Sequence, residues 1–554
     1  MLPVRPFPFG TRSAQSDGGG CRCTARLLFF LLFLPVLAQG QSPQLLWSFD
    51  TRDASFGQTA AGDIDNDGRL ELVFGCYRND SSVYALNAED GSLLWKVETH
   101  TPGGDGCNDV APVIFDVDND GSMEVVVPSS CNPTTYCFDG STGAIKWAAP
   151  TRGSDSPPTV ADIDGDGKLE ILHGEFGGYV ICLNAEDGNR EWELAVDTHS
   201  WIQTAPTLLD ADNDGTLDFI VATWNRTAGD TNTIRAYRCS DRSLLWSRPL
   251  ADVTYHGTTV ADLDGDGLPE LAIGDYSGTL SVLNAEDGSI AWTMPSIGSG
   301  HYIGAPVSAG DVDGDGYCEL IVVSWYKVMA LSRSGTRLWE YDIPGYSTAF
   351  RGAALADVDG DALPDVIFGT SSGLLVALNG LSGMELWSVD LAAMYGDSRF
   401  TLDHAPIVAD LDGDDALDVF IVGGYTTYPD FSNNFGRAYA LSIGKGMGPD
   451  WLMFQHDLQR SASLCSRGTT SVRLESENTA AALFLYPLPV RDELRIESGE
   501  LRSFRIVDAT GRVVAECAEP RRTAILDISA LPRGVYFLLA GSGIDVIVRA
   551  FVTQ

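Results

Sequence analysis

The chain has 554 residues with 76 acidic and 36 basic side chains, and its formal net charge at pH 7 is −40. An apolar content of 44% is too high for a disordered acidic chain, and the acidic balance offers no basic face to phosphates, which excludes nucleic acid as a partner. A chain of this length forms one domain only when internal repeats build it.

Residues 1–40 are predicted to be a signal peptide. Arg22 and Arg26 precede an apolar run from Leu27 to Leu37, and Ala38-Gln39-Gly40 supplies small residues for cleavage. The run is short for a membrane span, so we expect no transmembrane segment after signal removal; a membrane anchor is the alternative. Export would place the protein in an oxidising, calcium-rich exterior.

The cysteines are not expected to form a disulfide framework. Cys131 and Cys137 are close enough in sequence to staple one loop. Cys182 and Cys239 lie in strand-like runs and are predicted to be buried apolar residues.

The dominant feature of the chain is a nine-residue acidic motif that occurs eight times. Its first copy runs from Asp63 to Glu71, with carboxylates at positions one, three, five and nine. The copies recur about every 50 residues, which is the spacing of a supersecondary repeat. The predicted metal ligands are Asp63, Asp65, Asp67 and Glu71; Asp116, Asp118, Asp120 and Glu124; Asp162, Asp164, Asp166 and Glu170; Asp210, Asp212, Asp214 and Asp218; Asp262, Asp264, Asp266 and Glu270; Asp311, Asp313, Asp315 and Glu319; Asp357, Asp359, Asp361 and Asp365; and Asp410, Asp412, Asp414 and Asp418.

Oxygen-only ligands in a tight loop predict Ca²⁺ as the cofactor. Glycine at position six permits the sharp turn in the first six copies, and these six loops are expected to bind Ca²⁺. Ala362 and Asp415 replace the glycine in the last two copies, so metal binding there is an open question. An EF-hand would need a glutamate at position 12, where seven of the eight copies have an apolar residue such as Phe74, so each loop joins two strands.

One repeat unit, residues 157–196, reads as four antiparallel strands with a turn about every ten residues, which is the pattern of a β-propeller blade. A tryptophan recurs in the fourth strand and is predicted to wedge between neighbouring blades. The eighth repeat lacks a clear fourth strand, and Leu45 to Phe49 matches the missing one. We therefore predict an all-β, eight-bladed β-propeller over residues 41–465, closed by the first strand of the mature chain, with Trp451 to Arg460 packed on the ring.

The strand–acidic loop–strand unit resembles the FG-GAP repeats of integrin α-subunits and related bacterial surface proteins. The tail Leu183-Asn184-Ala185-Glu186-Asp187-Gly188, followed by Trp192, resembles the repeat of quinoprotein dehydrogenase propellers. In those families the calcium loops are structural elements of the blade, which implies that they carry no chemistry here.

The C-terminal part differs in composition from the repeats. After a linker at residues 466–480, residues 481–554 form short alternating strands that predict a small β-sandwich. The segment resembles the C-terminal sorting domain of the type IX secretion system, most specifically in Gly534-Val535-Tyr536-Phe537-Leu538. The resemblance implies contact with the secretion machinery and a secreted or surface location on a Gram-negative bacterium; an ordinary accessory sandwich is the alternative.

The face of the ring opposite the acidic loops is the expected ligand face. Aromatic residues recur there, and five of the seven histidines, His100, His199, His256, His301 and His404, lie in the links between blades. Such a surface suits a glycan or a protein ligand. Two alternatives are core packing of the aromatic residues and a transition-metal site made by the histidines. The candidates are Tyr77, Phe176, Trp224, Tyr276, Trp325, His301 and His404.

Three functions are compatible with the sequence. The favoured one is a monomeric, secreted calcium-binding module for binding or adhesion, without catalytic residues. The alternative is a polysaccharide-active enzyme of the lyase type, in which Arg351, Arg399 and His404 could act. A quinone-dependent dehydrogenase is disfavoured because the adjacent cysteine pair usual in that family is absent.

Overall fold

The computed structural model describes residues 42–100, 106–225, 227, 231–296, 298, 300–444, 446 and 451–465, and the backbone of seven strands between residues 483 and 553. The predicted signal peptide and linker lie outside the described residues. Among the described residues, no helix is long and apolar enough to cross a membrane.

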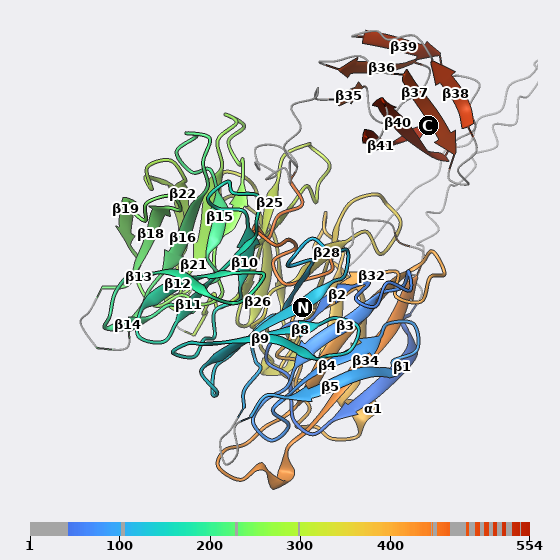
Figure 1. Ribbon diagram of the computed structural model, residues 1–554. Helices are drawn as coiled ribbons and strands as arrows, with labels where there is room; N and C mark the ends of the chain where they lie inside the picture. The colour runs from blue at the N-terminus through green and yellow to red at the C-terminus, as the bar shows by residue number, and fades with distance from the viewer. Residues whose placement is uncertain are drawn as a thin grey trace, which may run out of the picture.

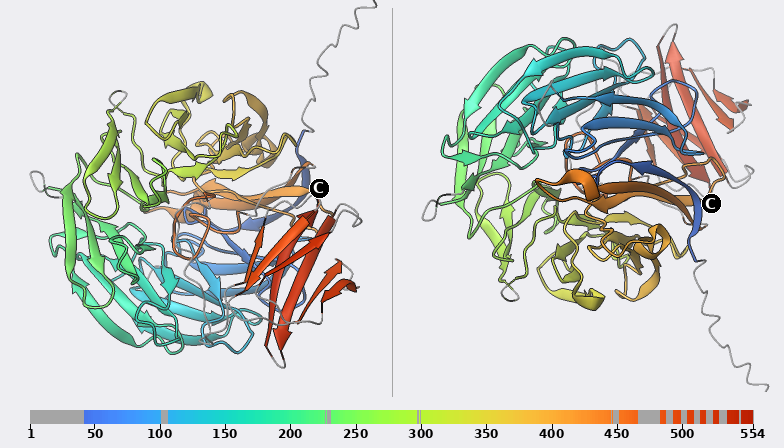
Figure 2. Two further views of the ribbon diagram at one scale, coloured as in Figure 1. Left: turned by 90° about the horizontal axis from the view of Figure 1, so that it is seen from above. Right: turned by 90° about the horizontal axis from the view of Figure 1, so that it is seen from below.

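Residues 44–444 form eight antiparallel four-stranded sheets arranged around a central axis (Figures 1 and 2). Within each blade the strands follow one another outward from the axis, and in the last blade β32 is innermost and β1 outermost. The chain is therefore an eight-bladed β-propeller, as the repeat predicts.

The strands of the first four blades are β2 (Ala60–Gly62), β3 (Glu71–Gly75), β4 (Ser82–Asn87) and β5 (Leu93–Glu98); β6 (Val113–Phe115), β7 (Glu124–Ser129), β8 (Thr134–Asp139) and β9 (Ile145–Pro150); β10 (Thr159–Ala161), β11 (Glu170–Glu175), β12 (Tyr179–Asn184) and β13 (Arg190–Ala195); and β15 (Thr207–Leu209), β16 (Asp218–Ala222), β18 (Thr233–Arg238) and β19 (Leu244–Pro249). A short pair, β14 (Ser200–Trp201) and β17 (Trp224–Asn225), connects blades three and four.

The strands of the last four blades are β20 (Thr259–Ala261), β21 (Glu270–Gly274), β22 (Leu280–Asn284) and β23 (Ile290–Met294); β24 (Ser308–Gly310), β25 (Glu319–Ser324), β26 (Lys327–Leu331) and β27 (Arg337–Asp342); β28 (Ala354–Ala356), β29 (Asp365–Gly369), β30 (Leu374–Leu378) and β31 (Glu385–Asp390); and β32 (Ile407–Ala409), β33 (Leu417–Tyr425), β34 (Phe435–Gly444) and β1 (Gln44–Thr51). Among the described residues, three short helices lie in connections: η1 (Pro344–Tyr346), α1 (Leu391–Tyr395) and η2 (Phe431–Asn433).

The fourth-strand tryptophans join neighbouring blades, as predicted. Trp47 packs against the turn at Gly91, where a Cβ atom would lie 2.3 Å from the indole ring, and its Nε1 donates to Ala88 O at 2.7 Å. Gly91 also has a φ of 70°, so glycine serves both the turn and the close approach. Equivalent indole bonds reach the next blade from Trp95, Trp147, Trp246, Trp292 and Trp339.

The ring is closed by its N-terminal strand. β1 pairs antiparallel with β34, with Phe49 opposite Ala438, so the predicted closure of the last blade is confirmed. This pairing covers the outer edge of β34, which would otherwise present unpaired backbone groups to solvent.

Residues 451–465 form a plug along the propeller axis. Backbone amides of the innermost strands donate to it from Ala61, Val160, Leu208, Val260 and Ala309, which belong to five blades. Arg460 is completely buried and donates to Pro158 O at 2.9 Å. The predicted packing of this segment on the ring is thus confirmed, and it supplies hydrogen-bond partners for strands that have no inner neighbour.

The disulfides differ from the expected pairing. Cys107 bonds to Cys131, and Cys318 bonds to Cys465, which fastens the end of the plug to blade six. Cys137, expected to pair with Cys131, is a free and buried side chain in β8. Sequence proximity misled here because Cys131 lies in a loop beside the preceding blade link, whereas Cys137 points into the blade core. Cys182 and Cys239 are free and buried, as predicted.

The C-terminal strands form two antiparallel sheets. One contains β35 (Leu483–Tyr486), β36 (Glu493–Ser498) and β39 (Thr523–Asp527); the other contains β37 (Ser503–Asp508), β38 (Val513–Cys517), β40 (Gly534–Ser542) and β41 (Asp545–Thr553). A small β-sandwich needs two such sheets.

Candidate metal centres and binding face

Each acidic loop is folded around its first aspartate. Asp63 Oδ2 accepts a hydrogen bond from Gly68 N at 3.0 Å, and Oδ1 accepts one from Asp67 N at 3.1 Å. The carboxylate at position nine closes the loop from the other side, because Glu71 Oε2 accepts from Ile64 N at 2.8 Å. These bonds turn the acidic side chains of one loop toward a common centre.

In at least five loops, three carboxylates bring oxygen atoms within 4.8 Å of one another: Asp63, Asp65 and Glu71; Asp116, Asp118 and Glu124; Asp162, Asp164 and Glu170; Asp210, Asp212 and Asp218; and Asp262, Asp264 and Asp266. Burial raises the pKa of Glu71 to about 7 and that of Glu170 to about 8. A bound cation would offset the desolvation of these carboxylates, so the donor sets fit a metal.

The two loops without glycine keep the same fold. Ala362 and Asp415 adopt φ values of 72° and 65°, in the left-handed region that glycine occupies elsewhere. Their backbone amides donate to Asp357 Oδ2 and Asp410 Oδ2 at 2.9 and 3.0 Å. The replacement of glycine therefore leaves the arrangement of the carboxylates intact.

On the opposite face, three of the predicted aromatic residues belong to one cluster. The rings of Trp224 and Tyr276 lie 5.0 Å apart, Tyr276 lies 5.5 Å from Tyr302, and Tyr302 lies 5.3 Å from Trp325. All are partly exposed. Phe350 from the next blade link lies 5.6 Å from Trp325 and completes this aromatic cluster.

The other candidates lie outside the aromatic cluster. Tyr77 packs on Phe56 and Phe176 packs on Trp201. His301 lies beside the cluster, 5.9 Å from the ring of Tyr326, which lies 6.5 Å from that of Trp325. His404 is buried, and burial lowers its pKa to about 3. A neutral, buried His404 cannot contact a ligand at the surface, so the prediction that it belongs to the ligand face is wrong.

The sequence interpretation missed a polar group around the axis. Asp109, Asp155 and Asp403 each stand seven residues before the first aspartate of their repeat, at the equivalent position of three blade links. Arg351 crosses from the link of blade seven to that of blade five, where Nη1 lies 2.5 Å from His256 Nε2. Counting positions backward from each acidic loop would have revealed the three aspartates.

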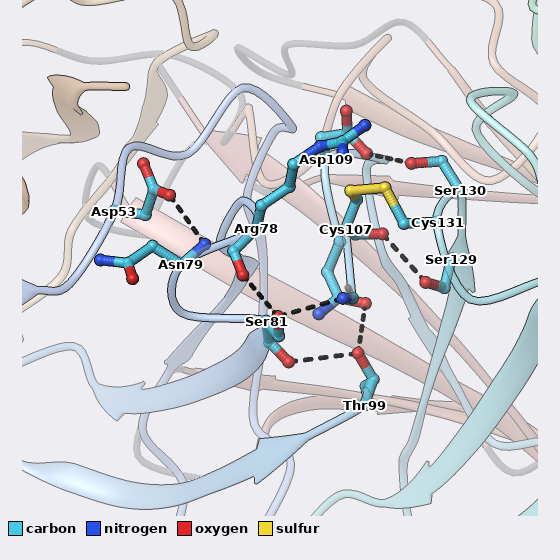
Figure 3. Close-up of a disulfide and its surroundings, with 12 residues drawn as sticks. Asp53, Arg78, Asn79, Ser81, Thr99, Cys107, Asp109, Ser129, Ser130 and Cys131 are labelled. Carbon is cyan, nitrogen blue, oxygen red and sulfur yellow. Dashed lines mark hydrogen bonds between the residues drawn. A yellow bond between two sulfur atoms is a disulfide. The ribbon is translucent and has the colours of Figure 1, made fainter. Parts of the chain in front are cut away.

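The axial aspartates are held by neighbouring side chains. Gln203 Nε2 donates to Asp155 Oδ2 at 2.8 Å, and burial together with the charge of Asp109 raises the pKa of Asp155 to about 7. Ser130 Oγ donates to Asp109 at 2.8 Å, directly beside the Cys107–Cys131 disulfide (Figure 3). The disulfide therefore fixes the blade link that carries Asp109.

Comparison with family models divides the chain into three regions. The FG-GAP-like repeat matches residues 63–127, 116–173 and 162–221, and the model described as outer membrane protein assembly factor BamB matches residues 230–434. The secretion system C-terminal sorting domain matches residues 484–554. The propeller therefore contains FG-GAP-like repeats followed by a BamB-like region, and a sorting domain follows it in the chain. That domain indicates secretion through the type IX system to the cell surface or the extracellular space.

Individual relatives are distant. The BamB protein of Shewanella oneidensis is 28% identical over 150 residues, which is 25% of this chain and 34% of that protein, so the match spans about a third of the relative. Among solved structures, the quinohemoprotein alcohol dehydrogenase of Pseudomonas putida is 14% identical with a TM-score of 0.51, covering 74% of this chain and 78% of its own.

A europium-containing methanol dehydrogenase is 15% identical with a TM-score of 0.52, covering 72% of this chain and 93% of its own. The Sqt1 protein of Saccharomyces cerevisiae is 13% identical with a TM-score of 0.52, covering 73% and 100%. At such identities the likeness shows the fold alone.

Proposed function

We propose that the protein is a secreted or surface-attached binding module, stabilised by Ca²⁺ in its acidic loops, which holds a glycan or protein ligand on the opposite face. The observation that carries this proposal is the partly exposed aromatic cluster of Trp224, Tyr276, Tyr302, Trp325 and Phe350, which continues through four blades. Exposed aromatic rings offer a large contact area at a low cost in side-chain entropy.

Calcium is the metal that best suits the acidic loops. Carboxylate and backbone oxygens are the ligands of hard cations, and extracellular modules hold Ca²⁺ with dissociation constants of about 10⁻⁴ to 10⁻³ M. On the face that carries the acidic loops, the carboxylates would be occupied by the metal. The aromatic cluster on the opposite face is therefore the surface left for a ligand. This division assigns stability to one face and recognition to the other.

The groups considered for a lyase are engaged with neighbours. Arg351 is largely buried and bonded to His256, Arg399 pairs with Asp397 at 2.5 Å, and His404 is buried. These contacts favour binding over catalysis.

The test measures binding and melting on the same variants. Trp224→Ala and Trp325→Ala in the secreted protein should abolish binding to the ligands found on a glycan array or a surface-protein panel, with small losses of melting temperature. Phe176→Ala is the matched control, because Phe176 lies on the same face outside the aromatic cluster. Retained binding in both tryptophan variants would contradict the proposed face, and a melting loss as large as that of Trp95→Ala would identify the rings as core.

A further inference from the structure

The carboxylates of the second acidic loop are already paired with a basic side chain. Lys146, the second residue of β9, places Nζ 2.9 Å from Asp118 Oδ2 and 2.8 Å from Glu124 Oε1. These are positions three and nine of the loop, and both belong to its metal-binding group. Glu124 is only 1% exposed, so the ammonium is the counter-ion of a buried carboxylate.

The fourth loop contains a basic group from a different position. Arg238, the last residue of β18, lies opposite Asp218 in cross-strand register. Its Nη2 contacts Asp212 and lies 3.5 Å from Asp214 Oδ2. The same register position is an asparagine in other blades, as the pairs Glu71–Asn87 and Glu170–Asn184 show.

Basic residues near other loops bind elsewhere. Lys168 belongs to the third loop, but its Nζ binds Glu186 at 2.6 Å. Arg69 belongs to the first loop, and its Nη1 binds Glu89 at 3.1 Å. Neither partner is one of the predicted metal ligands. The position of Lys146 is also uncharged or acidic in the other seven blades, where the tryptophan is preceded by Leu46, Leu94, Glu191, Leu245, Ala291, Leu338 or Leu386.

An ammonium or guanidinium group at this place competes directly with a metal. Ca²⁺ takes six to eight oxygen ligands at about 2.3–2.6 Å, and a nitrogen in hydrogen-bond contact with two of those oxygens occupies the same space and repels the ion. We propose that Lys146 and Arg238 are built-in cations that take the place of Ca²⁺ in the second and fourth loops. The metal ions of the ring are then confined to the other loops.

This inference rests on the proposed binding of Ca²⁺. It differs from the expectation based on glycine at position six, which favoured the first six loops over the last two as metal sites. The second and fourth loops both have glycine at position six, Gly121 and Gly215. Among the described residues, by contrast, no lysine or arginine pairs with the carboxylates of the loops that contain Ala362 and Asp415. The cation next to the carboxylates, rather than the turn residue, decides which loops take metal.

The first experiment counts the bound ions. Purified mature protein is stripped with chelator and dialysed against Ca²⁺, and bound calcium per chain is measured by atomic emission. Lys146→Met and Arg238→Met should each bind about one ion more than the unmodified protein, and the double variant about two more, because each substitution frees one set of carboxylates. Lys168→Met and Arg69→Met are the matched controls and should leave the count unchanged. An unchanged count in both loop variants would overturn the proposal.

The second experiment does not depend on the folding of any variant. Long-wavelength anomalous diffraction from calcium-saturated crystals of the unmodified protein should give peaks in loops such as the first and third, and none in the second and fourth. Peaks in the second and fourth loops would overturn the built-in cations alone. The absence of calcium from every loop would overturn the proposed calcium stabilisation, and this inference with it.

Discussion

Single side chains organise the acidic loops, as Asp162 and Asp410 illustrate. Asp162 accepts hydrogen bonds from Gly165 N and Gly167 N at 2.7 and 3.0 Å, and Asp410 accepts from Gly413 N and Asp415 N at 2.8 and 3.0 Å. The two loops are thus equally well formed.

We expect Asp162→Ala and Asp410→Ala to reduce stability in calcium by similar amounts, about 1–3 kcal/mol each, because each loses one linked ion. Thermal unfolding with saturating Ca²⁺ and with chelator measures the difference. Asp187→Ala, an exposed turn residue of the third blade, is the control. A loss that is the same with and without calcium would show that the aspartates act on the loop fold alone.

Asp155 should make the folding stability depend on pH with the opposite sign to a salt-bridged carboxylate. Its pKa of about 7 in the folded protein is raised above the ordinary value of 3.8, chiefly by burial. The unfolded chain therefore releases this proton at lower pH, and the group destabilises the fold increasingly as pH rises from about 4 to about 7. Asp155→Asn should raise the melting temperature at pH 8 and have little effect at pH 4. Equal effects at both pH values would refute this assignment.

Closure of the propeller ring depends on one strand, β1. It pairs along its length with β34, and Trp47 packs between its own blade and the turn at Gly91. A deletion of residues 41–50 should expose the edge of β34 and cause aggregation or loss of cooperative unfolding. Light scattering and thermal unfolding of the truncated chain check this, with Trp47→Ala separating the packing of one ring from the pairing of the strand. A monomeric truncated protein of unchanged stability would show that the ring closes without β1.

At the scale of the whole molecule, the plug and its disulfide tie distant blades together. Cys318 and Cys465 are 147 residues apart, whereas Cys107 and Cys131 are 24 apart. Because a longer closed loop removes more entropy from the unfolded chain, Cys318→Ser with Cys465→Ser should cost about 4–5 kcal/mol, more than the corresponding change at Cys107 and Cys131. Denaturant unfolding under oxidising and reducing conditions compares the two. A larger loss at Cys107 and Cys131 would mean that local packing, not loop closure, dominates.

The repeated features could be predicted because each is local and occurs many times. The acidic motif fixes the blade count, and the match of Trp47 to Trp95 reveals the closing strand. The contacts specific to this protein could not be predicted in the same way. Lys146 and Arg238 reach the loops only through the pairing of neighbouring strands, and Arg351 meets His256 across the axis. The partner of Cys465 depends on the path of the plug through the ring.

The plug also determines how the molecule would carry mechanical load. Its described contacts end at Cys465, which precedes the sorting domain in the chain and is bonded to Cys318 in blade six. Tension applied through the C-terminal segment would therefore be borne by a covalent bond to the sixth blade, instead of pulling hydrogen bonds of β34 apart one by one. Proteolysis after residue 465 would likewise leave the plug in place, so a propeller released from its sorting domain and one still tethered by it would share the same folded ring.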